Sequence, residues 1–173
     1  MATYELNGSN LNAEIVSSIA DHWADPQNFT LSISPDAAGR VERASQAVAE
    51  FVRRGDIIYG ISTGFGDFKS KIIPPEHLRQ LQRNILTSHA TGVGDLLPPA
   101  VVRAMMAVRL QTFLQGNSGI RMETLTALLR MINQGVYPLI PAQGSLGASG
   151  DLAPLAHMAL TLIGEGLAQY QGE

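Results

Sequence analysis

The sequence predicts a mainly α-helical fold that is interrupted by a few short extended segments. Two observations carry this prediction. Apolar residues recur every three or four positions in several long segments, which places them on one face of a helix. The same segments begin at serine or proline and end just before glycine, which is the order of helix start and stop signals. A chain of 173 residues is long enough to bury a core, so we expect one domain over residues 1–173.

The segment 34–55 shows these signals most completely. Ser34 can accept a hydrogen bond as the N-cap, Pro35 suits the first helical position, and Asp36 places a negative charge in the first turn. Two arginines stand in the expected last turn, just before Gly55. The apolar face of this helix comprises Val41, Ala44, Val48 and Phe51.

The middle of the chain predicts a connector and two helices. Residues 56–62, DIIYGIS, are rich in β-branched residues and run into glycines, so we expect an extended connector there. Helices are predicted within 74–92 and 98–116, because each segment opens with a pair of prolines and ends at glycine. The apolar stripe of the first of these helices comprises Leu78, Leu81, Ile85 and Leu86.

The last third of the chain predicts two more helices, separated by an irregular loop. The segment 119–135 has an apolar face of Leu125, Leu128, Leu129 and Ile132. Pro138 and Pro141 keep the following loop from being helical. The segment 151–166 is apolar on nearly every side, so we expect it in the middle of a helical assembly. Its His157 is predicted to be a hydrogen-bonded core residue and not a ligand.

The composition excludes several classes of protein. Charged residues make up only 16% of the chain and the net charge is −3, so we expect no nucleic-acid surface and a surface partly covered by other protein. The sequence contains no run of 18 apolar residues, so no membrane span is predicted. The first residues also lack the pattern of a secretory signal, so we expect a cytoplasmic protein. Cysteine is absent and the four histidines show no paired spacing, so neither a disulfide nor a metal site is predicted.

The glycine-rich stretch GSLGASGD, residues 144–151, allows three interpretations. It can be a flexible turn before a helix. It can be a phosphate cradle, although the P-loop spacing and a nearby lysine are missing. It can also be a segment that reacts with itself, because in a tight bend the amide nitrogen of Gly150 can bond to the carbonyl carbon of Ala148. Loss of water, together with loss of the Ser149 hydroxyl, would then leave an electrophilic exocyclic methylene on a five-membered ring.

Three blocks of the sequence resemble one known family. GSLGASGDLAPLAHMALTLIGEG is similar to the segment of the aromatic amino-acid ammonia-lyases and aminomutases whose Ala-Ser-Gly forms 4-methylideneimidazole-5-one (MIO). YGISTGFGDF resembles the tyrosine loop of that family, and LQRNILTSHATGVGD resembles its substrate-selecting helix end. The blocks occur in the family's order and at its spacing. The resemblance implies a large all-helical lyase, of which this shorter chain is the N-terminal, MIO-bearing part.

The resemblance also implies roles for residues near the reaction. Tyr59 matches the tyrosine that removes the β-proton of the substrate; without the motif it would be an ordinary tyrosine at a loop edge. Ala148, Ser149 and Gly150 would form MIO autocatalytically, without a metal or a diffusible cofactor. Asp151 would orient the loop for ring closure, and it would also serve as N-cap or first-turn carboxylate of the next helix.

Four further positions match substrate-binding residues of the family: Ser88, His89, Leu152 and Gly66. An imidazole at position 89 can form a hydrogen bond with another imidazole or with a phenol. Beside a phenyl ring it would have no partner, which costs binding free energy, so phenylalanine is disfavoured as the substrate. The plain alternative for His89 is a contact with the end of its own helix. Gly66 lies with Gly60 and Gly64 in a loop that we expect to fold over the substrate.

The resemblance implies the elimination of ammonia from an aromatic L-amino acid, with L-histidine giving trans-urocanate as the favoured case. A tyrosine ammonia-lyase or tyrosine 2,3-aminomutase shares these motifs, and the sequence leaves open whether MIO acts at the amine or the aromatic ring of the substrate. The non-enzymatic alternative is an inactive truncated fragment, a helical scaffold that self-associates through exposed apolar faces. The partners expected are the amino-acid substrate and further copies of the chain, a tetramer in the family, with neither nucleic acid nor membrane.

Overall fold

The computed structural model describes residues 2–148 and 150–170, and it is mainly α-helical, as predicted. The helices of this part are α1 (Ala13–Asp21), α2 (Pro35–Arg54), α3 (Leu78–His89), α4 (Pro99–Phe113), α5 (Met122–Gln134) and α6 (Leu152–Leu162). The strands are β1 (Ala2–Leu6), β2 (Phe29–Ile33), β3 (Val93–Leu96), β4 (Val136–Pro138), β5 (Pro141–Gln143) and β6 (Ala168–Tyr170). Each sheet in the described part has two strands: β1 with β2, β3 with β5 and β4 with β6.

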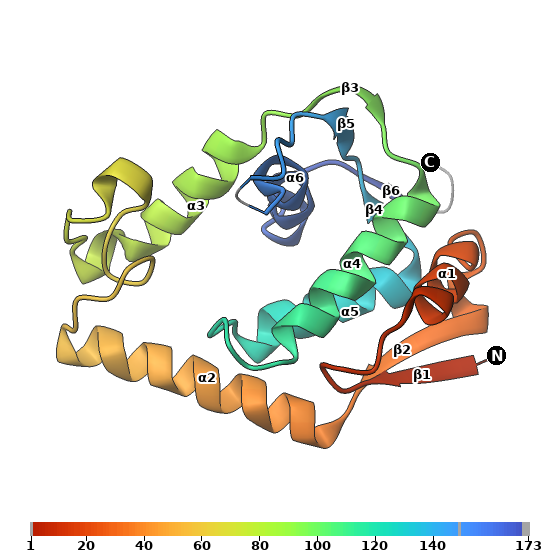
Figure 1. Cartoon of the computed structure of the whole chain (residues 1–173), viewed down its shortest axis with the longest axis horizontal. Coiled ribbons are helices and arrows are strands. Elements are labelled where there is room, and N and C mark those ends of the chain that lie inside the picture. Colours follow the sequence, from red (N-terminus) through yellow and green to blue (C-terminus); the bar gives the residue numbers. More distant parts are fainter. Residues whose placement is uncertain (1, 149, 171–173) are drawn as a thin grey trace.

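Helix α4 forms the centre of the molecule and packs against both α1 and α5 (Figure 1). Its side chains Val102, Met106 and Leu110 are fully buried, together with Leu128 and Ile132 of α5. Removal of this apolar surface from water is the main stabilisation of the core.

A buried cation joins α4 to four other elements. Arg103 is completely buried, and its Nε donates a hydrogen bond of 2.7 Å to the carbonyl of Ile19 at the end of α1. Its Nη1 donates to the carbonyl of Ile132 at 2.6 Å and to the hydroxyl of Tyr137 at 3.1 Å. Its Nη2 donates to the carbonyl of Phe29 at 2.6 Å. Carbonyls in the last turn of a helix lack an intrahelical partner and attract cations. The guanidinium of Arg103 therefore supplies hydrogen bonds that the C-terminal ends of α1 and α5 would otherwise lack.

Helix α2 lies at the edge of the molecule and has the predicted caps (Figure 1). The hydroxyl of Ser34 accepts a hydrogen bond of 3.3 Å from the amide of Ala37. Gly55 adopts the left-handed conformation, with φ of 75°, that closes a helix C-terminus. The sequence prediction for this helix is therefore confirmed from Pro35 to Arg54.

Residues 2–33 contain two strands and a helix that were not predicted from the sequence. β1 and β2 run parallel, with Ala2 opposite Phe29 at the start of the register. Helix α1 lies in the connection between them, and Asn12 caps it by accepting a 2.9 Å hydrogen bond from the amide of Ile15. Leu6 of β1 is fully buried in the common core.

Two predicted segments differ in detail from the structure. Helix α3 begins at Leu78, after a 3₁₀ turn over Pro75–His77, because the amide of His77 bonds to a carbonyl only three residues back. Residues 59–62, in the second half of the predicted extended connector, form a turn instead, because the amides of Ile61 and Ser62 both donate to the carbonyl of residue 58.

Helix α6 packs against α3, with further contacts to α5 and β4. Ala153, Ala156 and Met158 are buried, whereas Leu152 and Ile163 are each 45% exposed. The expected burial of α6 on nearly every side is therefore not found within the described residues, because its neighbours cover only part of its surface.

Residues 2–148 and 150–170 contain neither a helix that could span a membrane nor a cluster of side chains that could hold a metal ion. No helix in this part is both long enough and apolar enough to cross a membrane. No group of three or more His, Cys, Asp or Glu side chains in this part could hold a metal ion.

Candidate active site

The last turn of α3 fixes the imidazole of His89 through its Nδ1 atom. This atom lies 2.8 Å from the carbonyl oxygen of Ile85 and 3.1 Å from the hydroxyl of Ser88. Because a carbonyl oxygen can only accept, the contact to Ile85 requires a proton on Nδ1. The helix-end contact expected for His89 is thus present, and it uses Nδ1 and not Nε2.

Ser88 is exposed beside His89, and its hydroxyl lies 3.1 Å from the same carbonyl of Ile85. It lines a wide groove on α3 together with Arg83 and Glu165. Nε of Arg83 and Oε1 of Glu165 form an ion pair of 2.7 Å that joins α3 to the segment after α6. Because Arg83 is largely exposed, this pair orients the two segments more than it stabilises them.

Strands β3 and β5 bring the end of α3 to the glycine-rich loop (Figure 1). β3 follows closely after His89, and β5 leads directly into the loop at Gly144. Val93 of β3 lies opposite Gln143 of β5. A Cβ atom placed on Gly144 would lie 3.1 Å from the Cα atom of Gly92, so the two backbones touch. The predicted substrate-selecting segment and the predicted cyclising loop are therefore neighbours.

The glycine-rich loop is tightly bent and is closed by a hydrogen bond between its ends. The hydroxyl of Ser145 donates to Oδ1 of Asp151 at 2.5 Å and accepts from the amide of Gly147 at 3.3 Å. Gly147, Gly150 and Asp151 all have positive φ, of 69°, 87° and 57° respectively. Among the described residues that are not glycine, only Asp151 has a positive φ, a conformation that a short polar side chain tolerates better than most.

Two members of the predicted cyclising triplet, Ala148 and Gly150, are among the described residues of this loop. Ala148 and Gly150 are both exposed, and a Cβ atom on Gly150 would meet nothing within 4 Å. Ser149 lies outside the described residues. Gly147 and Gly150 have the positive φ that glycine adopts readily, so the residue types and the described backbone of this loop are compatible with the predicted group.

Asp151 directly precedes α6 without capping it through its side chain. Its carboxylate is turned back toward Ser145, while its backbone carbonyl accepts from the amide of Leu155 at 3.2 Å. Asp151 is thus the N-cap residue of α6, as expected, but its side chain makes no cap hydrogen bond, because the carboxylate bonds to Ser145 within the loop. Leu152, the first residue of α6, is 45% exposed beside the loop.

The tyrosine loop stands apart from this cluster. Tyr59 is 63% exposed, and its ring meets the ring of Phe65 edge-on at 5.8 Å between centroids. Gly66 has a φ of 56° and begins a short 3₁₀ turn. In Figure 1 this yellow segment lies between the end of α2 and the start of α3, away from the blue loop that precedes α6. The chain thus brings the Ser88 and His89 region to the glycine-rich loop, but not Tyr59 or Gly66.

Two hydroxyl residues that sequence reasoning missed anchor the tyrosine loop. Ser62 donates to the carbonyl of Asp56 at 2.6 Å and accepts from the amide of Ile58 at 2.9 Å. The buried hydroxyl of Thr63 accepts from the amide of Gly60 at 3.3 Å. The sequence did contain the signal, because serine and threonine in turns commonly bond to nearby backbone.

His157 of α6 makes a contact to the segment after α3. Its Nε2 accepts a hydrogen bond of 3.0 Å from the backbone amide of Gly92. The prediction that His157 is a hydrogen-bonded residue is thereby confirmed, although the side chain is only partly buried. Burial lowers the pKa of His157, which favours the neutral ring that this hydrogen bond requires.

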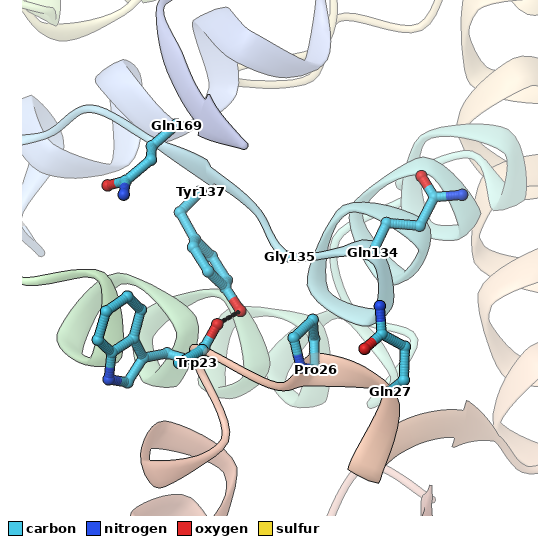
Figure 2. A pocket seen from close by; sticks show the side chains of 8 residues that line it. Trp23, Pro26, Gln27, Gln134, Gly135, Tyr137 and Gln169 are labelled. Atoms are coloured by element: carbon cyan, nitrogen blue, oxygen red, sulfur yellow. Dashed lines mark hydrogen bonds between the residues drawn. The ribbon is translucent and has the colours of Figure 1, made fainter. Parts of the chain in front are cut away.

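A cavity of about 410 Å³ contains none of the predicted site residues. Trp23, Gln134, Tyr137 and Gln169 line it (Figure 2). The hydroxyl of Tyr137 donates to the carbonyl of Trp23 at 2.8 Å and accepts from Arg103. Burial raises the pKa of Tyr137 and the charge of Arg103 offsets part of that rise, so the phenol remains a protonated structural group.

Comparisons with known proteins give one consistent result. The model of a family described as aromatic amino acid lyase matches residues 11–173. Histidine ammonia-lyase of Chloroflexus aurantiacus is 50% identical to this chain over 168 residues, which are 97% of this chain and 32% of that protein. The chain therefore spans about a third of the length of the curated relatives it matches.

Solved structures resemble the whole of this chain. Ergothionase from Treponema denticola, an ergothioneine-degrading enzyme, matches with a TM-score of 0.92 and 34% identity, over 99% of this chain and 33% of that one. Tyrosine aminomutase from Streptomyces globisporus matches with a TM-score of 0.90 and 32% identity, over 99% of this chain and 31% of that one.

Proposed function

Because the chain belongs to the aromatic amino acid lyase family, we propose that it is part of an ammonia-lyase that eliminates ammonia from an aromatic L-amino acid. The proposed substrate is L-histidine and the proposed product is trans-urocanate. The 50% identity to a histidine ammonia-lyase supports this choice of substrate. The polar pair of Ser88 and His89 supports it as well.

The main observation behind this proposal is that Nδ1 of His89 lies 2.8 Å from the carbonyl oxygen of Ile85. Its Nδ1 is committed to the carbonyl of Ile85, so its Nε2 can accept a hydrogen bond from a substrate. The imidazole N–H of L-histidine is such a donor, whereas a phenyl ring has none. An unpaired polar group in a closed site costs binding free energy, and this difference favours histidine over phenylalanine.

The glycine-rich loop is the proposed site of MIO, formed from Ala148, Ser149 and Gly150. When present, the group would supply an electrophilic carbon without any metal or diffusible cofactor. Ser145 and Asp151 would hold the ends of the loop together while it forms, because their side chains already bond to each other. Leu152 would place an apolar side chain beside the substrate.

Tyr59 is the proposed base for the β-proton of the substrate. A phenol has a pKa near 10, so this role requires a positive environment that lowers the pKa in the closed site. Tyr59 stands apart from the triplet in one chain, so the proposal includes either closure of the loop around Gly66 or a contribution from a second copy. A homo-oligomer is therefore part of the proposal.

The second candidate function is that of a tyrosine ammonia-lyase or a tyrosine 2,3-aminomutase. The structural likeness to tyrosine aminomutase favours keeping this candidate. The acceptor at Nε2 of His89 suits a phenol O–H as well as an imidazole N–H. The two functions differ in their products: a β-amino acid from the mutase, and an unsaturated acid with free ammonia from the lyase.

The test is a turnover assay of the complete gene product with L-histidine, L-tyrosine and L-phenylalanine, followed by product analysis. We expect urocanate and ammonia from L-histidine, an intact mass reduced by two waters, and the near-ultraviolet absorbance of MIO. Ser149→Ala should abolish the absorbance and nearly all turnover. If all three amino acids are left unchanged and the mass shows no water loss, the proposal is wrong and the inactive scaffold is supported.

A further inference from the structure

The hydrogen bond from the Gly92 amide to Nε2 of His157 joins two parts of the candidate site across a long stretch of sequence. Gly92 lies in the short segment between His89 and strand β3. His157 lies on α6, which starts at the residue after Asp151. The bond therefore ties the backbone that follows the imidazole of His89 to the helix that follows the cyclising triplet.

Gly92 is held closely by its neighbours. A Cβ atom placed on Gly92 would lie 3.1 Å from Nε2 of His157, 3.1 Å from Cβ of Pro141 and 3.3 Å from the carbonyl oxygen of Gln143. Pro141 and Gln143 belong to β5, so α6 and β5 both contact this residue. A close-packed backbone of this kind has little room to shift, so a change in one contact alters the position of the others.

The contact also has a defined chemical requirement. An amide N–H can only donate, so Nε2 of His157 must be the unprotonated nitrogen of a neutral ring. An apolar side chain of similar size would fill the space but would leave the Gly92 amide without this acceptor. A glutamine side chain can place its amide oxygen near the position of Nε2, whereas asparagine is one methylene shorter.

We propose that His157 is a positioning residue that sets the distance between the substrate-binding imidazole of His89 and the glycine-rich loop. This role rests on the proposed function. His157 acts through Gly92 and touches neither the substrate nor the reacting atoms. Its loss is expected to misplace the bound substrate relative to the electrophile, while the loop itself, closed by Ser145 and Asp151, still forms.

The test compares His157→Gln, His157→Asn and His157→Met in the complete gene product. We expect His157→Met and His157→Asn to lower kcat/KM for L-histidine by roughly 10- to 100-fold, the size of effect that a misplacement of about 1 Å produces. We expect His157→Gln to stay within about threefold of the unaltered protein. The near-ultraviolet absorbance and the loss of two waters should be the same in all of them.

Hydrogen exchange at the Gly92 amide gives a readout that does not depend on turnover. Exchange should be faster in His157→Met and His157→Asn than in the unaltered protein, and it should be slow in His157→Gln. Thermal unfolding of each variant identifies any that do not fold. If His157→Met does not fold, the comparison of kcat/KM between His157→Gln and His157→Asn tests the proposal. Equal kcat/KM for Gln and Asn, or faster exchange with unchanged kcat/KM, would overturn the proposal.

Failure of the proposed function has a different outcome. In that case the unaltered protein turns over none of the three aromatic amino acids and lacks the absorbance of MIO. The exchange experiment still reports whether His157 holds Gly92. The positioning role is overturned if the unaltered protein shows no turnover and the Gly92 amide also exchanges slowly in every variant.

Discussion

The hydroxyl of Ser145 donates a hydrogen bond of 2.5 Å to the carboxylate of Asp151, and this contact closes the glycine-rich loop at its two ends. The same hydroxyl accepts from the amide of Gly147. Asp151 holds the left-handed backbone conformation that allows its carboxylate to turn back. The predicted cyclising triplet stands in the sequence between these two joined residues, so we expect the contact to reduce the conformations that must be lost before a ring can close.

Ser145→Ala should slow or reduce the formation of MIO, because it removes the contact between the ends of the loop. We expect a lower near-ultraviolet absorbance and a mixture of masses, some without the loss of two waters. Ser145→Thr keeps the hydroxyl and serves as the matched control, with near-normal absorbance. Complete ring closure in Ser145→Ala, at the rate of the unaltered protein, would show that this contact does not assist the reaction.

His89→Leu should lower kcat/KM for L-histidine by roughly 10- to 100-fold, because the substrate N–H loses its acceptor in a closed site. The activity toward L-phenylalanine should not fall in parallel. His89→Gln retains an acceptor and is the control. Steady-state kinetics with both amino acids check this prediction, and an equal loss for both would contradict the specificity role of Nε2.

Arg103→Met should reduce the free energy of unfolding by about 3–5 kcal/mol, because it leaves buried carbonyls at the ends of α1 and α5 without their donor. Arg109→Met is the matched control on the same helix. Arg109 lies over the ring of Phe113, with 4.5 Å from its guanidinium carbon to the ring centroid, and its change should cost about 1 kcal/mol or less. Denaturant unfolding measures the loss of stability in each variant. Similar losses in the two variants would show that the hydrogen bonds of Arg103 do not stabilise the core more than the ring contact of Arg109 does.

Stability should fall as the pH drops below about 6.5, in part through His157. Burial lowers the pKa of His157 in the folded state, so the unfolded state takes up a proton at a higher pH than the folded state does. This contribution is fully present above the unfolded pKa, and it is lost as the pH falls toward the folded value. The measurement is the unfolding midpoint of the unaltered protein and of His157→Gln, each at pH 7.5 and 5.5. The change with pH in the difference between the two midpoints gives the contribution of His157. A difference that is independent of pH would contradict it.

The elements around α6 carry other groups that are charged or that titrate. They are Arg79, Arg83 and His89 on α3, Glu123 and Arg130 on α5, and Tyr137 on β4. All of them are present in both proteins of the comparison, so their own titration cancels in the difference. The lowered pKa of His157 is attributed to burial and not to a charged neighbour.

The helices could be predicted because their signals are local. Ser34, Pro35 and Gly55 mark the ends of α2 within one stretch of sequence, and the structure confirms both ends. The parallel pair β1 and β2 could not be predicted in the same way. Each strand has five residues, and their pairing depends on contacts across the intervening helix. Helix α1 does have a local start signal, because Asn12 is its N-cap.

The candidate site was predictable in its residues more than in its geometry. The motif located the loop around Asp151 and the helix end at His89, and the structure places these two segments side by side through β3 and β5. The bond from Gly92 to His157 joins residues 65 positions apart, so no sequence period reveals it. Asp151 is the N-cap residue of α6 as expected, but the sequence did not predict that its backbone is left-handed or that its carboxylate bonds to Ser145 in place of the helix amides.

The close approach of Gly92 and Gly144 limits how this protein can be engineered. A library that aims to widen substrate scope can vary Ser88 and His89, whose side chains end at exposed or partly exposed positions. The two glycines should be left out of such a library, because even alanine at Gly92 would press on β5 and α6 at once. Substitutions are therefore expected to be tolerated at the proposed substrate-binding side chains, but not at the two glycines where the backbones touch.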